Sequence, residues 1–344
     1  MTTVEVADDP ARWDAIVKAS PTAVFFQTSA WIEAVCRAYG YRRFLMIAGD
    51  HGAESGVLPL VEVKSRIFGH RLISLPFCEY GGPVILRGGG DTLEALLTEG
   101  RRIRSEVGAK FCEYRAEEAG PLRPSDPEVG TSSTYVTFRV RGVPDEIWGR
   151  MDKKLRNRIR RAEEASIQLV RVGEPELAEF YKFYLKTEAR RGSPVHSQQF
   201  FKELLKAADG AIGITLAKRG GKPVSAILTG TLGQRSNWWL NVNDPEFLSL
   251  NATSLMLWDF VKRTAKTREF SLDLGRTRRD TSVYDYKSQW GGEEVSLAHF
   301  SDPPGPSAID PRSPRFRLAS AVWRVLPKSA VAWAGPRLMA GIAL

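Results

Sequence analysis

Residues 212–230 read IGITLAKRGGKPVSAILTG. Two runs rich in apolar and β-branched residues, 212–218 and 223–230, flank the tetrapeptide 219–222, which has two glycines at its centre. A Gly-Gly pair between two such runs is typical of a tight hairpin turn, because both glycines can adopt positive φ angles. The stretch therefore predicts a β-hairpin.

A helix and then a strand are predicted to follow this hairpin, and the first half of the chain repeats that order. In the first half, the predicted elements are strands Phe44–Ala48 and Gly56–Lys64, joined by residues 49–52, then helix Asp91–Val107 and strand Lys110–Arg115. In the second half, the hairpin is followed by helix Asn251–Thr264 and strand Glu269–Leu274. Alternating strands and helices indicate a layered α/β or α+β fold. The repeat favours two tandem copies of one fold, although any α/β chain can produce such a coincidence.

Composition favours a folded chain over a disordered one and points to anionic partners. Of 344 residues, 43% are hydrophobic, enough for a large core in two domains, and the formal net charge is +9. That charge suits phosphates, acidic lipids or nucleic acid. Cys36, Cys78 and Cys112 are far apart and form no C-x-x-C, which argues against a disulfide framework or a metal site. With no signal-like N-terminus and no long apolar run, we expect a cytoplasmic protein.

Four segments are predicted along the chain. They are a first lobe at 1–143, a basic helix with the second and catalytic lobe at 144–300, a proline-rich linker at 301–314 and a basic amphipathic tail at 315–344. The tail combines apolar Leu318, Val322, Val325 and Leu326, with Trp323 nearby, and the cations Arg315, Arg317, Arg324 and Lys328. This composition suits a helix lying on an anionic membrane, at the inner face. Docking onto the protein's own surface is the alternative.

A strongly basic helix is predicted at Trp148–Ala165. Its apolar residues, Met151, Leu155, Ile159 and Ala162, recur at helical spacing, while Lys154, Arg158, Arg161 and four further cations occupy the other positions. Each like-charge pair three or four residues apart costs roughly 0.2–0.5 kcal/mol in an isolated helix. A bound phosphate would offset this repulsion, so we predict phosphate recognition. A solvated helix face is the alternative.

Three motifs resemble those of the FemAB family of aminoacyltransferases. The first is SLPFCEYGG at 74–82, after GVLPL at 56–60, and the second is KLRNRIRRA at 154–162. The third and most specific is LDLGRT at 272–277, followed by YDYKSQWG at 284–291. Together they span residues 25–300, and the tail is similar to that of FemAB-related proteins found beside exosortase and exopolysaccharide systems.

The resemblance implies two tandem GNAT-like domains and transfer of an aminoacyl group from aminoacyl-tRNA to an amine of a cell-envelope or peptidoglycan precursor, with no free-standing cofactor. The long helical arm of some members is missing, which leaves the tRNA donor open. An acyl-CoA enzyme normally has an Arg/Gln-x-x-Gly-x-Gly/Ala loop before a helix, and Arg87–Gly90 lacks that spacing. The alternatives are a GNAT N-acyltransferase using acyl-CoA or acyl carrier protein, and a non-catalytic envelope-assembly or nucleic-acid-binding module. The sequence does not predict the oligomeric state.

Aminolysis of an ester needs a positioned amine, stabilisation of the oxyanion and a route for the amine proton, but no protein nucleophile. Lys287 is the predicted oxyanion or phosphate ligand, with a surface lysine as the alternative. Asp273 is predicted to accept a proton or to pair with Arg276, and Tyr284 completes the predicted catalytic set. The predicted substrate-binding residues are Arg276, Tyr286, Trp290, Arg158, Arg161, Lys154, Glu79 and Tyr80. Glu79 and Tyr80 are expected to line an acceptor cleft or to form a structural turn.

Overall fold

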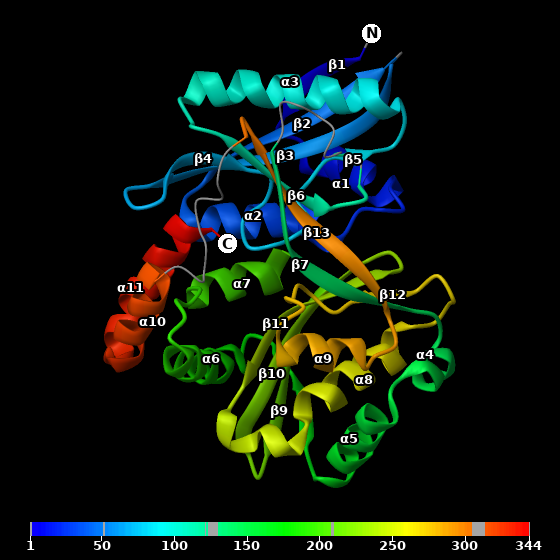
Figure 1. The fold of residues 1–344 in the computed structure, drawn as a ribbon, viewed down its shortest axis with the longest axis vertical. Coiled ribbons are helices and arrows are strands. Elements are labelled where there is room, and N and C mark those ends of the chain that lie inside the picture. The colour runs from blue at the N-terminus through cyan, green and yellow to red at the C-terminus, as the bar shows by residue number, and fades with distance from the viewer. Residues whose placement is uncertain are drawn as a thin grey trace. The chain divides into compact units, whose positions relative to one another are not determined.

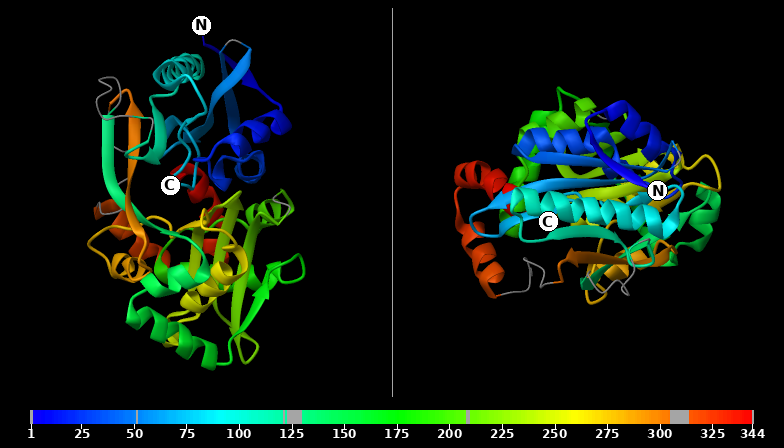
Figure 2. Two further views of the ribbon diagram at one scale, coloured as in Figure 1. Left: turned by 90° about the vertical axis from the view of Figure 1, so that its right-hand side faces the viewer. Right: turned by 90° about the horizontal axis from the view of Figure 1, so that it is seen from above.

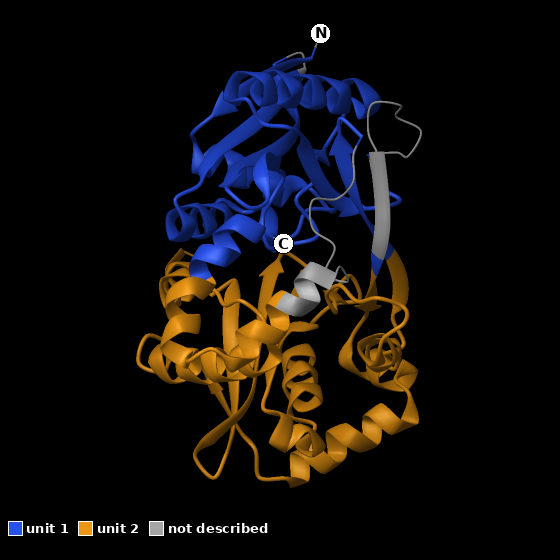
Figure 3. Ribbon diagram, turned by 60° about the vertical axis from the view of Figure 1, so that its left-hand side comes forward, with its two compact units in different colours: residues 1–135, 296–316, 336–344 blue, residues 136–295, 317–335 orange. Residues whose placement is uncertain are grey.

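The computed structural model describes residues 2–50, 52–120, 122, 130–207, 210–304 and 314–343. It divides into two compact units (Figure 3): unit 1 comprises Met1–Tyr135, Ser296–Phe316 and Pro336–Leu344, and unit 2 comprises Val136–Val295 and Arg317–Gly335. The chain thus enters unit 2 at Val136, ahead of the boundary predicted after residue 143, and both units are discontinuous. Most of the predicted linker, residues 305–313, lies outside the described residues, as does His51 of the predicted turn 49–52.

The elements of unit 1 are shown in Figure 1 from the blue end of the colour bar. They are β1 (Thr3–Ala7), α1 (Pro10–Ala19), the 3₁₀ helix η1 (Phe25–Gln27), α2 (Ser29–Tyr39), β2 (Arg42–Asp50), β3 (Ala53–Ser65), β4 (Gly69–Ile73), β5 (Val84–Ile85), α3 (Gly89–Val107) and β6 (Cys112–Glu117). Two strands, β7 (Gly130–Arg141) and β13 (Glu293–Asp302), contribute residues to both units.

Unit 2 holds the middle of the chain. Its elements are α4 (Pro144–Arg150), α5 (Lys153–Glu164), β8 (Gln168–Arg171), α6 (Leu177–Arg191), α7 (Gln198–Ala207), β9 (Ile212–Arg219), β10 (Lys222–Leu232), β11 (Arg235–Asn243), η2 (Pro245–Leu250), α8 (Ala252–Thr264), β12 (Ser271–Asp273) and α9 (Ser282–Ser288). The chain ends in α10 (Pro314–Val325) and α11 (Lys328–Ile342).

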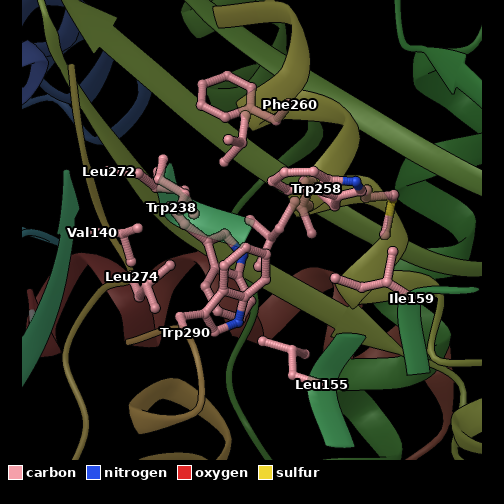
Figure 4. Packing of buried hydrophobic residues seen from close by; sticks show 14 of the residues in the cluster. Val140, Leu155, Ile159, Trp238, Trp258, Phe260, Leu272, Leu274 and Trp290 are labelled. Carbon is pink, nitrogen blue, oxygen red and sulfur yellow. The ribbon is translucent and has the colours of Figure 1, made fainter. Parts of the chain in front are cut away.

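Each unit is a mixed sheet covered by helices. In unit 1 the strand order is β1-β2-β3-β4-β6-β13, with α3 on one face of the strands and α1 and α2 on the other (Figure 2). In unit 2 the order is β7-β12-β11-β10-β9-β8. The main core of unit 2 lies between α5, α8 and one face of this sheet, and includes Val140, Leu155, Trp258 and Trp290 (Figure 4).

The predicted repeat is confirmed, and it is larger than the sequence indicated. Hairpin β2–β3 corresponds to β9–β10, α3 to α8 and β6 to β12. The predicted turn between these strands is present, and Gly220 and Gly221 both have positive φ angles in it. Each hairpin also has a third strand that the sequence analysis missed, β4 or β11, and that strand pairs in parallel with the strand after the helix.

The predicted basic helix is shorter than expected at its N-terminus. Trp148 belongs to α4, and the chain breaks at Met151 before α5 begins at Lys153. Asp152 causes the break, because its carboxylate accepts a hydrogen bond from the Lys154 amide at 2.6 Å and so caps α5. The apolar face is confirmed, since Leu155, Ile159 and Ala162 are buried.

The tail forms two helices, and its end is part of unit 1. The Tyr41 hydroxyl donates to Ala340 O at 2.6 Å, Arg71 donates to Gly341 O and Ile342 O, and Arg115 donates to Ala343 O at 2.9 Å. Because side chains of unit 1 bind these carbonyls, the docking alternative holds for the last described residues. The side chains of residues 314–318 lie outside the described part. Within the described residues, no helix has the length and apolarity needed to cross a membrane.

Candidate functional site

The LDLGRT motif lies where a parallel strand pair ends. Strands β11 and β12 pair in the register Asn237↔Asp273, and β12 stops there. The chain then turns at Gly275, whose φ is +74°, and a Cβ atom there would lie 2.6 Å from Trp238 O. Only glycine fits this turn, because both the backbone angle and the space exclude a side chain. The carboxyl ends of parallel strands are also where ligand sites of α/β sheets tend to open.

Asp273 holds this turn in place. Its buried carboxylate Oδ1 accepts from the Gly275 amide at 2.7 Å and from the Thr137 hydroxyl at 2.7 Å. The same hydroxyl lies 3.0 Å from Gly275 O. Thr137 belongs to β7, so the turn is fixed from the neighbouring strand as well as from its own.

Lys287 reaches the same turn from α9. That helix begins after Thr281, whose hydroxyl accepts from the Tyr284 amide. The Lys287 side chain is 5% exposed, and its Nζ donates to Gly275 O at 2.8 Å and to Arg276 O at 2.9 Å. It also lies 5.2 Å from the ring centroid of Trp238. Lys287 is therefore not a surface lysine.

Burial lowers the pKa of Lys287 to about 7. The Asp273 carboxylate acts in the opposite direction and raises this pKa, while the Arg276 guanidinium lowers it. A lysine that titrates near neutral pH beside a fixed carboxylate is a typical feature of functional sites. The backbone carbonyls and the Trp238 ring suit the charged form.

The other predicted residues of the motif region differ in their surroundings. Tyr286 is half-buried, its hydroxyl lies 3.1 Å from Ser254 Oγ, and burial raises its pKa. Trp290 is buried in the unit 2 core (Figure 4). The Tyr284 hydroxyl donates to Glu294 at 2.6 Å near the surface, and this hydrogen bond raises the pKa of Tyr284. Arg276 is half-buried directly after Gly275.

The basic helix contributes one residue to this region. Arg158 Nη1 donates to Gln289 Oε1 at 3.0 Å, which ties α5 to the segment after Lys287. Lys154 and Arg161 are exposed, and their side chains are open to an anionic ligand. Arg158 thus belongs to the Lys287 region, whereas Lys154 and Arg161 remain surface cations.

Glu79 and Tyr80 lie in unit 1, whereas Lys287 lies in unit 2. Glu79 is buried, with Oε2 2.8 Å from His299 Nε2. The buried Tyr80 ring stacks on Phe26 with a centroid distance of 6.5 Å. Both side chains are built into the interior of their unit, and their part in an acceptor cleft stays a prediction.

Sequence reasoning missed Thr137, Asn237 and Trp238. Thr137 lies in β7, which the prediction assigned to the first lobe, and the two others lie in the unpredicted strand β11. No motif marks any of them. Apolar residues at every second position from Trp238 to Val242 could have indicated a strand. The register shift at Trp239 then turns Trp238 and Val242, both buried, to opposite faces of the sheet.

Comparison with known proteins supports the predicted family resemblance. Residues 149–288 match the family model described as acetyltransferase (GNAT) domain, and these residues include Lys287 and Asp273. The fold is similar to that of FemX, with a TM-score of 0.69 and 14% identity over 93% of this chain and 100% of that one. No curated protein matches the chain.

Two further solved structures share the tandem arrangement. A tandem GNAT protein from the clavulanic acid biosynthesis pathway has a TM-score of 0.55 and 12% identity over 89% of this chain and 99% of its own. L-PGS from Bacillus licheniformis has a TM-score of 0.56 and 12% identity over 96% and 98%. The predicted tandem GNAT fold is therefore confirmed, and the domain match supports an N-acyltransferase.

Proposed function

We propose that unit 2 of this tandem GNAT protein transfers an aminoacyl group from aminoacyl-tRNA to an amine of a cell-envelope precursor. The observation that carries this proposal is the buried Lys287 ammonium, held by two backbone carbonyls at a strand end beside Asp273. The GNAT match over residues 149–288 supports acyl transfer, and the motifs that resemble FemAB proteins favour this donor and acceptor.

The reaction needs only positioning and electrostatic stabilisation. The acceptor amine attacks the ester carbonyl carbon, so that a C–N bond forms and the carbonyl oxygen becomes an oxyanion. Lys287, in its charged form, donates its third N–H to that oxygen and stabilises it. The C–O bond to the ribose then breaks, and the proton released by the amine ends on the ribose oxygen. Atoms and charge balance without a protein nucleophile.

The segment before α8 favours a donor other than acyl-CoA. A GNAT domain that uses CoA holds the pyrophosphate with backbone amides of a glycine-rich loop before a helix. Residues 244–251 contain no glycine and include Asp244 and Glu246. The Asp244 carboxylate accepts from Lys186 Nζ at 3.0 Å, and it also accepts from the Glu246 amide and so caps η2. Carboxylates and a 3₁₀ helix at this position disfavour a pyrophosphate.

The acceptor is proposed to carry phosphate. Lys154 and Arg161 are exposed cations on α5, and Arg158 links this helix to the segment after Lys287. A phosphate-bearing precursor bound along α5 would offset the repulsion between these cations. Neutral acceptors would gain nothing from them.

A donor panel tests the proposed reaction. Purified protein is given an amine-bearing envelope precursor and either charged tRNA, acyl-CoA or acylated carrier protein, and amide product is measured by mass spectrometry. We expect product with charged tRNA, and its loss after ribonuclease treatment of the donor. Product with acyl-CoA alone would support the alternative GNAT reaction, and no product with any donor would support a binding module.

The tail helices support a proposed contact with an anionic membrane. Val322, Val325 and Trp333 are 52%, 81% and 65% exposed. Residues 314–343 include five cations and no Asp or Glu: Arg315, Arg317, Arg324, Lys328 and Arg337. Exposed apolar groups within a basic segment suit the interface of an acidic bilayer.

Point variants test this contact better than truncation, because residues 340–343 are bound inside unit 1. Sedimentation with phosphatidylglycerol vesicles should fall several-fold for Val325→Ser/Trp333→Ser. The control Ile67→Ser removes a similarly exposed apolar side chain, 72% exposed, from unit 1 and should bind like the wild type. Equal sedimentation of all three proteins would exclude the tail as the contact.

A further inference from the structure

Asn237 is a buried side chain whose structural role is not evident. It is the third residue of β11 and is 3% exposed. Its carboxamide Oδ1 has no hydrogen-bond partner among the described residues. Leaving a buried polar atom unpaired costs about 1–3 kcal/mol, so such atoms are rare and need an explanation. A ligand that donates a hydrogen bond would supply one.

The position of Asn237 connects it to the candidate site. It is opposite Asp273 in the β11–β12 register, and Asp273 is opposite Arg139 in the β12–β7 register. Residues opposite one another in paired strands point to the same face of a sheet. Asn237, Asp273 and Arg139 therefore form one row of polar side chains. Their sequence neighbours Trp238, Leu272 and Val140 point to the other face, into the core (Figure 4).

The row is tied to Lys287 through the Gly275 turn. The Gly275 amide donates to Asp273, and its carbonyl accepts from Lys287 Nζ. The Asp273 oxygen that binds this amide also accepts from Thr137, so Asp273 serves the turn itself. In the row, Asn237 is the member with an acceptor atom that no described residue uses.

We propose that Asn237 positions the acceptor amine. Its Oδ1 accepts one N–H of the incoming amine and so directs the nitrogen lone pair toward the acyl carbon, whose oxygen faces Lys287. This inference rests on the proposed function and adds a positioning residue to it. The carboxamide carries no charge, so it stabilises the protonated amine, which has no lone pair and cannot attack, less than a carboxylate at this position would.

The substitution Asn237→Leu separates this role from a structural one. Leucine has nearly the same size and removes the unpaired oxygen, so the variant should be as stable as the wild type or more stable. The KM for the acceptor amine should rise at least tenfold, while the KM for the donor stays unchanged. The control Thr215→Val makes a buried polar-to-apolar change in β9 and should alter neither constant. An unchanged acceptor KM in a stable Asn237→Leu protein would overturn the inference.

The substitution Asn237→Asp adds a test of the chemical form. A carboxylate at this position would bind and stabilise the protonated amine, and so raise its pKa. The rising limb of the rate against pH should therefore move to higher pH than in the wild type. An unmoved limb would contradict direct contact between residue 237 and the amine.

A binding measurement keeps this inference distinct from the proposed function. L-alaninamide serves as a minimal amine, titrated without donor at a pH where it is largely neutral, and the Asn237 side-chain amide is followed by NMR. We expect the resonances of the Asn237 side-chain amide to shift as the amine is added. In the control Thr215→Val, the same resonances should shift as they do in the wild type. If wild-type protein transfers nothing from any donor, the proposed function fails, and this titration alone decides the role of Asn237. No shift at saturating amine would refute it.

Discussion

The two units use the same strand arrangement in opposite ways. In unit 1, parallel strands β4 and β6 pair through Leu72↔Cys112 and Ile73↔Glu113. Beyond that point the chain's own segment Ser74–Gly82 binds along β6: Ser74 Oγ accepts from the Arg115 amide, and the amides of Gly81 and Gly82 donate to Arg115 O. The end of the parallel pair is thus filled by backbone.

In unit 2 the corresponding pair, β11 and β12, ends at the Gly275 turn with the buried Lys287. The buried cations of the two units also differ in their partners. Arg71 and Arg115 of unit 1 bind carbonyls of residues 341–343, whereas Lys287 of unit 2 has its pKa lowered to about 7. In unit 1, backbone segments occupy the end of the parallel pair and bind the buried arginines. In unit 2, the end of the pair retains a buried lysine that can take part in a reaction. The duplicated fold alone therefore does not locate the site.

The largest effect is expected from Lys287→Met. Loss of one oxyanion donor typically lowers kcat by about 10²–10³-fold. Because the pKa of Lys287 is about 7 in the folded protein and 10.5 in a free lysine, the unfolded state binds more protons between these values. Burying the charge therefore costs stability most at and below pH 7, and methionine should raise the free energy of unfolding there. Single-turnover rates and urea titrations measure both effects.

Two outcomes would remove Lys287 from the mechanism. One is a wild-type rate in the folded variant. The other is a rate loss that only parallels loss of folded protein, as a structural role would give.

The substitution Arg115→Met in unit 1 should lower stability and leave the rate unchanged, the opposite of what is expected for Lys287→Met. This change leaves Glu113, whose carboxylate lies 2.7 Å from the guanidinium, and Ala343 O without their partner. Breaking a buried ion pair costs about 3–5 kcal/mol. The melting temperature should fall markedly, while the rate per folded molecule stays near wild type. A lost rate with an intact melting temperature would place chemistry in unit 1 as well.

The smallest of these effects is expected on α5. Arg158→Ala/Arg161→Ala should raise the KM of a phosphate-bearing substrate several-fold with little change in kcat, since remote phosphate contacts stabilise ground and transition states alike. The dependence of affinity on salt should also become shallower. Arg102→Ala/Lys110→Ala removes two cations from unit 1 and serves as the control. Identical salt dependence in all three proteins would leave α5 as a solvated helix.

The sequence predicted the helices and strands better than it predicted the environment of the individual site residues. Both hairpins, α3, α8 and the buried face of α5 were recognisable because periodicity and turn glycines are local signals. Strands β4 and β11 were missed, and with them Asn237, because their roles depend on pairing with distant strands. Lys287 could be named from its motif, but its burial and lowered pKa depend on the Gly275 carbonyl and on Trp238. The tail's docking depends on Arg71 and Arg115, which no pattern in the tail reveals.

The pH dependence of kcat, with acceptor and donor both saturating, tests most directly whether charged Lys287 performs the chemistry. The rate should fall about tenfold per pH unit above an apparent pKa near 7, since only the ammonium stabilises the oxyanion. Asp273→Asn should move this fall to lower pH, because the Asp273 carboxylate raises the pKa of Lys287. Lys287→Arg should abolish the fall, because arginine stays charged. A limb that rises with pH below this fall reports loss of the proton from the acceptor amine. A fall above pH 7 that persists in Lys287→Arg would contradict the role of charged Lys287 as the oxyanion ligand.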